Sequence, residues 1–309
     1  MKRSGLPEEY SPRLDTVRFR ERVEAAFDVL RSCELCPRNC RTDRLAGESG
    51  FCKLGKEPVV SSYGPHFGEE PPLVGRYGSG TIFLTGCNLG CIFCQNYDIS
   101  HLRRGSEVTI EEMSEMMLEL QERGCHNINF VTPTHQVPQI LRALLHARER
   151  GMVLPVVYNC GGYESIKILK LLDGIVDIYM PDAKYMDAAT AKRLSGVSDY
   201  PEVLKRVLVE MHKQVGDLHV SIDGIATRGL LLRHLVLPQG LAQTADLVEF
   251  VATNISKDTY VNIMGQYRPC YKAYKFPPLD RSVNYDEVEE AKEMAHSAGL
   301  HRGFTGDYI

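Results

Sequence analysis

The chain has 309 residues, and its 36 Lys and Arg against 40 Asp and Glu give a formal net charge of −4. Hydrophobic residues make up 43% and charged residues 25%, which is close to the average of soluble globular proteins and excludes a mainly disordered chain. The absence of a basic excess disfavours nucleic acid as a partner. No run of 18 apolar residues exists, so we expect no membrane-spanning helix.

Residues 1–5 lead into proline and glutamate rather than into an apolar stretch, so we expect no secretory signal. The ten cysteines are therefore expected in the reducing cytoplasm, where cysteines serve as metal ligands or catalytic groups rather than as disulfides. Seven of them form two groups, Cys33, Cys36, Cys40 and Cys52, and then Cys87, Cys91 and Cys94. The other three are scattered, as small buried hydrophobes often are.

The first 79 residues are predicted to form an N-terminal helix, over residues 16–31, and a cysteine-rich metal-binding segment. Residues 32–79 are rich in Cys, Gly, Pro and Arg and show little hydrophobic periodicity. Such a segment is expected to bury few side chains, so metal ligation would be what folds it.

From residue 80 short apolar runs alternate with amphipathic helices. Thr109 and Glu112 form a capping-box pattern, which predicts a helix from there to about residue 123. The predicted strands are 81–85, 127–131, 154–158, 175–180, 230–237 and 260–264, and the helices between them are 136–150, 164–172, 188–194, 201–214 and 241–255.

This alternation implies parallel strands joined by right-handed crossovers. Six such units predict an α/β fold, a partial (β/α)6 TIM-like barrel over residues 80–265, with a doubly wound sheet as the alternative. Residues 266–309 are predicted to be a C-terminal tail with a helix over 285–297. In either architecture ligands gather beyond the C-terminal ends of the strands.

The second cysteine group follows the first predicted strand directly, with the spacing C-x3-C-x2-C. Thiolates suit zinc and iron–sulfur clusters. Structural zinc sites use four ligands, whereas three thiolates on a cubane cluster leave one iron open to an external ligand. The motif at Cys87, Cys91 and Cys94 therefore favours a [4Fe-4S] cluster with an open iron.

This loop, with Phe93 before its last cysteine, resembles the radical S-adenosylmethionine (SAM) superfamily, and the resemblance extends over about residues 80–265. Residues 86–96 are similar to the activating enzymes of pyruvate formate-lyase. The resemblance implies that the cluster binds SAM at its open iron, with Phe93 and Gln95 among the cofactor contacts. It also implies a low-potential electron donor, of flavodoxin or ferredoxin type, that allows a 5′-deoxyadenosyl radical to form.

Other strand ends supply candidate SAM contacts. The family usually carries a Gly-Gly-Glu-Pro segment after the second strand, but this chain has Thr132 and keeps only the proline. Asn159 follows the third strand, where it would contact SAM or the substrate. By the resemblance, Lys184 would pair with the SAM carboxylate and Asp182 would bond the ribose. In the fifth strand, Arg233 and its successor point to opposite faces, so one of them can line the barrel.

The first cysteine group has the spacing C-x2-C-x3-C-x11-C, which can close one metal site. Either a second [4Fe-4S] cluster or Zn2+ would satisfy four thiolates. A similar pattern occurs in uncharacterised homologues of pyruvate formate-lyase activating enzymes. A cluster here would relay electrons or bind substrate, and zinc would hold the segment folded.

The sequence thus predicts a radical SAM oxidoreductase that removes a hydrogen atom from a protein or peptide substrate, with glycyl-radical activation as one form. Two alternatives stay open: radical modification of a small molecule, and a non-enzymatic iron–sulfur or zinc module. Walker, zinc-protease and serine-hydrolase motifs are absent.

Overall fold

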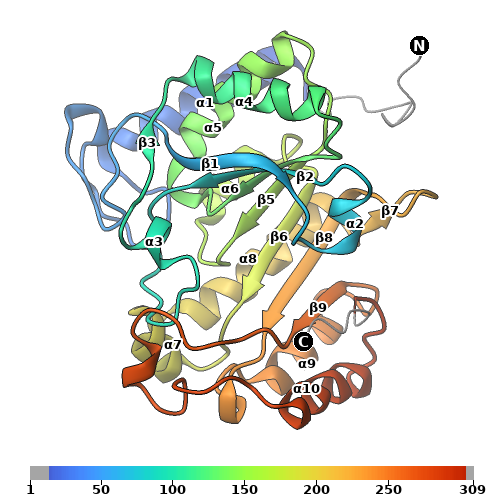
Figure 1. The fold of residues 1–309 in the computed structure, drawn as a ribbon. Helices are drawn as coiled ribbons and strands as arrows, with labels where there is room; N and C mark the ends of the chain where they lie inside the picture. The colour runs from blue at the N-terminus through green and yellow to red at the C-terminus, as the bar shows by residue number, and fades with distance from the viewer. Residues whose placement is uncertain (1–13, 304–309) are drawn as a thin grey trace.

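The computed structural model describes residues 14–303, and its centre is a mostly parallel sheet (Figure 1). Residues 1–5 and 304–309, which fall in the N-terminal and C-terminal predictions, lie outside the described residues. The parallel strands are β2 (Ser79–Leu84), β4 (Ile128–Val131), β5 (Val156–Cys160), β6 (Ile178–Ala183), β8 (Ala226–Leu235) and β9 (Tyr260–Met264).

These six strands pair in the order in which they occur along the chain. A doubly wound sheet would reverse its order at a switch point, so this order confirms the partial barrel. Within the described residues β2 pairs with β1 and β4 and does not pair with β9. The barrel is therefore open on the side between these two strands.

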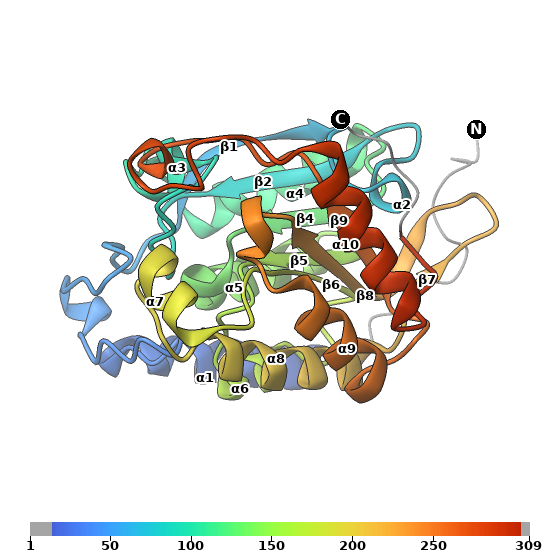
Figure 2. The same ribbon diagram turned by 90° about the horizontal axis from the view of Figure 1, so that it is seen from below.

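Helices cover the outer face of the sheet, and Figure 2 shows α6, α8 and α9 side by side along it. The helices of the barrel are α4 (Ile110–Glu122), α5 (Val137–Glu149), α6 (Ile166–Leu172), α7 (Ala188–Ser195), α8 (Tyr200–Val215) and α9 (Thr244–Asn254). Each turns its apolar positions toward the strands, as in α8, where Val203, Leu204 and Val207 are buried. The helix α10 (Tyr285–Ser297) has the bounds that the sequence predicts.

Local chemistry explains the helix ends. Thr109 and Glu112 bond each other's backbone N–H groups in the predicted capping box at the start of α4. The helix α10 begins with a second capping box, formed by Asn284 and Glu287. The N-terminal helix α1 (Thr16–Asp28) is capped by Asp15 and continues as the 3-10 turn η1 (Val29–Ser32).

The expectation that residues 32–79 bury little was wrong. Strand β1 (Val59–His66) pairs antiparallel with β2, and Leu35, Leu54 and Leu73 in this segment are buried. β1 was missed because only one of its side chains is buried, so its sequence lacks the alternation of a half-buried strand. Its place comes from backbone pairing with β2 and with the short β3 (Ser106–Glu107).

Two other short elements also carry no sequence pattern, the helix α2 (Pro71–Val74) and the strand β7 (His219–Val220). None of the helices in the described part of the chain is both long enough and apolar enough to cross a membrane.

A buried arginine ties the cysteine-rich segment to the barrel. The Arg44 side chain is fully buried, and its guanidinium donates to the carbonyl oxygens of Gly55 (2.7 and 3.0 Å) and His135 (2.7 Å). Because His135 follows β4, this residue fixes the segment against the carboxyl ends of the strands.

Candidate functional site

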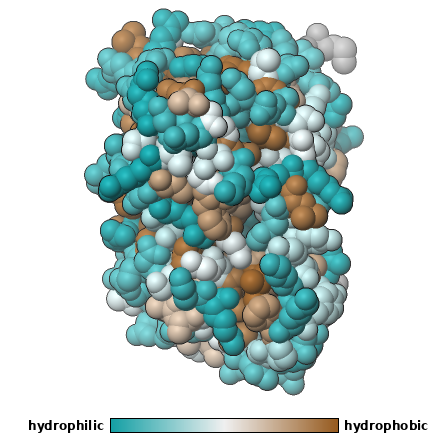
Figure 3. Space-filling view, turned by 90° about the vertical axis from the view of Figure 1, so that its left-hand side faces the viewer, coloured by the Kyte–Doolittle hydropathy of each residue, from teal (hydrophilic) through white to brown (hydrophobic). Residues whose placement is uncertain are grey.

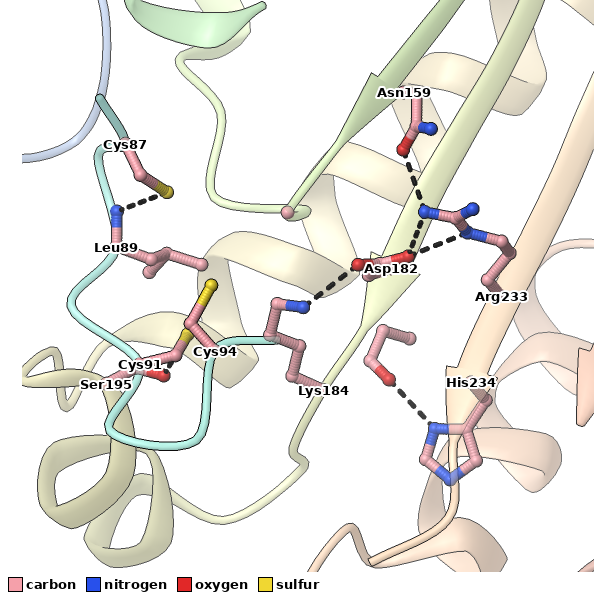
Figure 4. Close-up of polar contacts among 12 residues, drawn as sticks. Cys87, Leu89, Cys91, Cys94, Asn159, Asp182, Lys184, Ser195, Arg233 and His234 are labelled. Atoms are coloured by element: carbon pink, nitrogen blue, oxygen red, sulfur yellow. Dashed lines mark hydrogen bonds and ion pairs between the residues drawn. The ribbon is translucent and has the colours of Figure 1, made fainter. Parts of the chain in front are cut away.

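The loop after β2 carries the second cysteine group to the carboxyl end of the barrel (Figure 4). Cys91 is buried, and Cys87 and Cys94 are half-buried. Gly86 lies at φ +76°, where a side chain is strained, and a Cβ there would stand 3.1 Å from the His135 ring. The loop can therefore pass close to the strand ends only with glycine at this position.

Each sulfur of this loop has a hydrogen-bond partner from the chain. The backbone N–H of Leu89 donates to the Cys87 sulfur (3.3 Å). The hydroxyl of Ser195 lies 2.9 Å from the Cys91 sulfur, and that of Ser100 lies 3.2 Å from the Cys94 sulfur. Such groups can donate to thiolates and tune the potential of a cluster that they hold.

No group of three or more His, Cys, Asp and Glu side chains within residues 14–303 is arranged to hold a single metal ion. This holds for both cysteine groups of the described residues. Burial raises the pKa of the Cys87 thiol well above its usual value, so cluster binding would have to drive its deprotonation. The donors to sulfur and the glycine at the loop's entry fit a [4Fe-4S] cluster.

A chain of charged side chains faces the cysteines across the strand ends (Figure 4). Lys184 donates to one carboxylate oxygen of Asp182 (3.0 Å), and Arg233 donates to the other (2.8 Å). Arg233 also donates to the Asn159 side-chain oxygen (2.8 Å). The structure thus brings together three of the predicted SAM contacts, from β5, β6 and the loop after β6.

The pKa values of this group keep its charges fixed. Burial alone would raise the pKa of the Asp182 carboxyl, but the charges of Arg233 and Lys184 outweigh burial and hold that pKa at about 2. Burial would also lower the pKa of Lys184, but the Asp182 carboxylate raises it above its usual value. Near neutral pH the site therefore presents an ammonium, a carboxylate and a guanidinium.

The other predicted cofactor contacts lie in different surroundings. Phe93 is buried and packs edge-on against Tyr185 and Tyr267. Gln95 is exposed, and its side chain donates to the Gln266 carbonyl (3.3 Å). Thr132 has φ +61°, which is strained for a β-branched residue and is the kind of backbone outlier that gathers at functional sites.

Arg233 and His234 point to opposite faces of β8, as the alternation predicts. Arg233 reaches into the barrel, whereas His234 is fully buried outside it against Ala183 and Thr244. Burial holds the pKa of His234 at about 4, so the ring is neutral near neutral pH. Nδ1 faces the Ala183 carbonyl and therefore donates to it, which leaves Nε2 to accept from the Thr244 hydroxyl.

Sequence reasoning missed two carboxyls inside the barrel. Glu69 accepts from Arg233 (3.1 Å), and Glu70 accepts from the Asn262 side chain of β9 (3.0 Å). Both follow β1, in a loop with no motif. The only sequence signal was a pair of adjacent glutamates before two prolines, which carries no information about burial.

The four cysteines of the first group lie on turns that approach the loop after β2. Asn39 and Arg41 have positive φ, and the N–H of Phe51 donates to the Cys40 sulfur (3.4 Å). A Cβ on Gly50 would stand 2.7 Å from that sulfur, so the chain is held close around it. Burial raises the pKa of the Cys36 thiol to about 12. The tight turns and the N–H aimed at sulfur fit thiolate ligation of a metal.

Arg38 joins the two cysteine groups. Its guanidinium donates to the Asn88 carbonyl (2.6 Å) in the loop after β2, and it stacks 3.4 Å above the Phe51 ring. The first cysteine group therefore lies in contact with the loop that holds the second.

Figure 3 views the face that carries the cysteine-rich segment, where small hydrophobic patches are scattered over a mostly hydrophilic surface.

A match to a protein-family model identifies the class of protein to which this site belongs. Residues 81–228 match the family described as the radical SAM superfamily, so the chain carries a domain of that superfamily. Its members cleave SAM by radical chemistry at an iron–sulfur cluster. The narrower resemblance to activating enzymes stays a prediction.

Two curated proteins of Methanocaldococcus jannaschii are similar over most of the chain. The uncharacterized protein MJ0674 is 34% identical over 289 residues, which cover 90% of this chain and 78% of the relative. The uncharacterized protein MJ0808 is 25% identical over 299 residues, covering 89% and 80%. Among solved structures, a radical SAM methyltransferase from Sphaerobacter thermophilus aligns with a TM-score of 0.49 and 14% identity over 72% of this chain and 64% of that one. That likeness is too weak to bear on the substrate.

Proposed function

We propose that this radical SAM enzyme abstracts a hydrogen atom from a protein or peptide substrate, as an activating enzyme does, with glycyl-radical formation as one form of the reaction. The observation that carries the proposal is the open side of the barrel. A cavity of about 290 Å³ lies there, and Arg233 is part of its wall. A side opening admits a group carried on a polypeptide, whereas a closed barrel would favour a small molecule.

When bound at Cys87, Cys91 and Cys94, a [4Fe-4S] cluster supplies the electron that splits the sulfonium of SAM. The chain's own residues bind SAM and orient it. Lys184 uses one N–H on Asp182 and keeps two donors for the carboxylate of SAM. Asp182 has lone pairs left for the ribose hydroxyls.

Backbone contacts hold these groups in place. The Tyr200 hydroxyl donates to a backbone carbonyl, that of Gly161 (2.9 Å) or of Asp182 (2.8 Å), and accepts from the Lys184 N–H (3.1 Å). Tyr200 thereby fixes the loop after β6 against the end of β5. The positions of the ammonium and the carboxylate are set before SAM binds, which lowers the entropy cost of binding it.

The remaining parts of the proposal concern the metal at the first cysteine group, the cellular location of the protein and its electron donor. We assign a second [4Fe-4S] cluster or zinc to Cys33, Cys36, Cys40 and Cys52, supported by the turns around Cys40. We place the protein in the reducing cytoplasm, where cysteines serve as metal ligands rather than as disulfides. A flavodoxin or ferredoxin would supply electrons.

The test uses anaerobically reconstituted protein with SAM and dithionite. We expect 5′-deoxyadenosine to form, at a rate that rises when the correct substrate protein is added. Deuterium transfer from a deuterated partner protein into 5′-deoxyadenosine would support a protein substrate, and transfer from metabolites alone would favour the small-molecule alternative. If SAM binds but no 5′-deoxyadenosine forms, the proposal of an enzyme is wrong, and the alternative of a non-enzymatic binding module remains.

A further inference from the structure

The cavity on the open side of the barrel has an acidic floor. It lies between β9 and the loop that follows β1, and its walls include Glu69, Glu70, Arg233 and Asn262. The Glu70 side chain is only 4% exposed and that of Glu69 7%. Neither carboxyl is used by the SAM contacts described above.

One oxygen of Glu70 lacks a partner. Oε1 accepts from Asn262 (3.0 Å) and lies 3.9 Å from the Arg233 guanidinium. Oε2 is buried and has no hydrogen-bond partner within residues 14–303. A buried acceptor without a donor is costly, by about 1–3 kcal/mol and more when it is charged, so a native structure needs a reason to keep it. A donor on a ligand would provide one.

The charges around this oxygen do not balance. Arg233 serves three carboxyls, at 2.8 Å from Asp182, 3.1 Å from Glu69 and 3.9 Å from Glu70. The one other cation of the network, Lys184, pairs with Asp182. Burial raises the pKa of Glu69 to about 7 in spite of Arg233, so near neutral pH this carboxyl carries only part of a negative charge beside those of Glu70 and Asp182. The cavity therefore favours a ligand with a positive charge.

The remaining walls suit an alkyl chain. Met264 of β9 and Pro71 line the cavity beside the carboxyls, and Phe67, 62% exposed, stands at its edge. Methylene groups can pack on these side chains while a charged end reaches the carboxyls, as in lysine and arginine side chains.

We propose that this cavity is a substrate subsite for a primary ammonium or guanidinium on an alkyl chain, presented by a lysine or arginine side chain of the substrate peptide. The subsite would hold the peptide beside the radical site, because Arg233 contacts Asp182, and Asp182 contacts Lys184 opposite the cysteines (Figure 4). This inference rests on the proposed function for its peptide. A free polyamine presents the same chemistry, and the test separates the two sources.

The probes are the peptides acetyl-Gly-Lys-Gly-amide and acetyl-Gly-norleucine-Gly-amide, and free cadaverine. Binding is measured by calorimetry to anaerobically reconstituted protein with SAM and no reductant, so that the SAM charges are already in place. We expect the lysine peptide to bind at least about tenfold more tightly than its neutral counterpart, as one charge-assisted hydrogen bond implies. Glu70→Gln should reduce that ratio to about one.

Two further variants test whether the effect is specific to the cavity. Glu249→Gln changes an exposed carboxyl on α9 and should leave the ratio unchanged. Phe67→Ala changes an exposed side chain that cannot unfold the barrel, and it should weaken the lysine peptide by a few-fold whether or not Glu70→Gln folds.

Equal binding of the lysine and norleucine peptides would overturn the proposal, as would a folded Glu70→Gln protein that keeps the preference. Binding of cadaverine but not of the lysine peptide would overturn the peptide source. The titration is repeated without SAM, and a lysine peptide that binds only in its absence would overturn the proposal, because SAM itself would then occupy the carboxyls. Formation of 5′-deoxyadenosine is measured separately, so failure of the subsite and failure of the proposed function give different results.

Discussion

The two cysteine groups differ in number, in scaffold and in how the chain around them is held. Three cysteines lie on a loop that leaves a buried parallel strand, opposite the charged side chains of the barrel. Four lie in a segment whose strand β1 is mostly unburied and which is held by Arg38 and Arg44. A loop on a rigid strand can present an open metal position to a substrate, whereas four ligands close their own site.

The largest expected effect comes from removing the three cysteines of the loop after β2. Replacing Cys87, Cys91 and Cys94 by Ala should abolish 5′-deoxyadenosine formation and the reduced-cluster signal that changes with SAM, measured by electron paramagnetic resonance. The Cys125→Ala variant, outside both groups, serves as control. A SAM-sensitive signal that survives the triple change would contradict the assignment.

The triple variant also reports on the other group. Iron that remains in it would identify a second cluster at Cys33, Cys36, Cys40 and Cys52, and stoichiometric zinc would make that segment structural. Iron and zinc are measured by elemental analysis of the same sample.

Lys184→Ala should weaken SAM binding by about 10- to 100-fold, because one hydrogen bond to a charged group contributes about 1.5–3 kcal/mol. Calorimetry on the reconstituted protein measures it. Lys192→Ala removes an exposed lysine of α7 and should have no effect. Unchanged affinity in the Lys184 variant would remove this residue from the SAM site.

Arg44→Met tests the attachment of the cysteine-rich segment. It keeps much of the packing but strips donors from the carbonyls of Gly55 and His135, so the free energy of unfolding should fall by about 2–4 kcal/mol. Chemical denaturation measures the change. Arg41→Met, at an exposed ion pair in the same segment, should stay within about 0.5 kcal/mol. Equal losses in both variants would mean that Arg44 has no special role.

The free energy of unfolding should depend on pH because of His234, which is a buried residue of β8. Its pKa of about 4 in the folded protein lies below the usual 6.5, so the unfolded chain binds a proton that the folded chain does not. Stability is therefore lost as the pH falls from 6.5 toward 4, by about 1.4 kcal/mol at pH 5.5. Denaturation curves of His234→Gln should have a flatter pH slope than those of the exposed His219→Gln. A matching slope would contradict this account.

Much of the barrel could be predicted because its signals are local. The strands at β2, β4, β5, β6, β8 and β9, the capping box at Thr109 and the helix α10 all follow from periodicity or capping. Strand bounds shifted by two or three residues at β5 and β6, because an apolar run also covers the turn that leads into a buried strand. The alternation in β8 was enough to predict that Arg233 or His234 lines the barrel.

The sequence alone determined the cysteine spacing, the βα alternation and the Asp182–Lys184 step, and these are properties of neighbours along the chain. Only the tertiary structure decided that β1 joins the sheet, that Arg38 joins the two cysteine groups, and that Glu69 and Glu70 enter the barrel. Each of these depends on contacts between residues far apart in sequence, such as Glu70 with Asn262. Such contacts leave no periodic pattern, because burial there is set by the partner and not by the residue's neighbours.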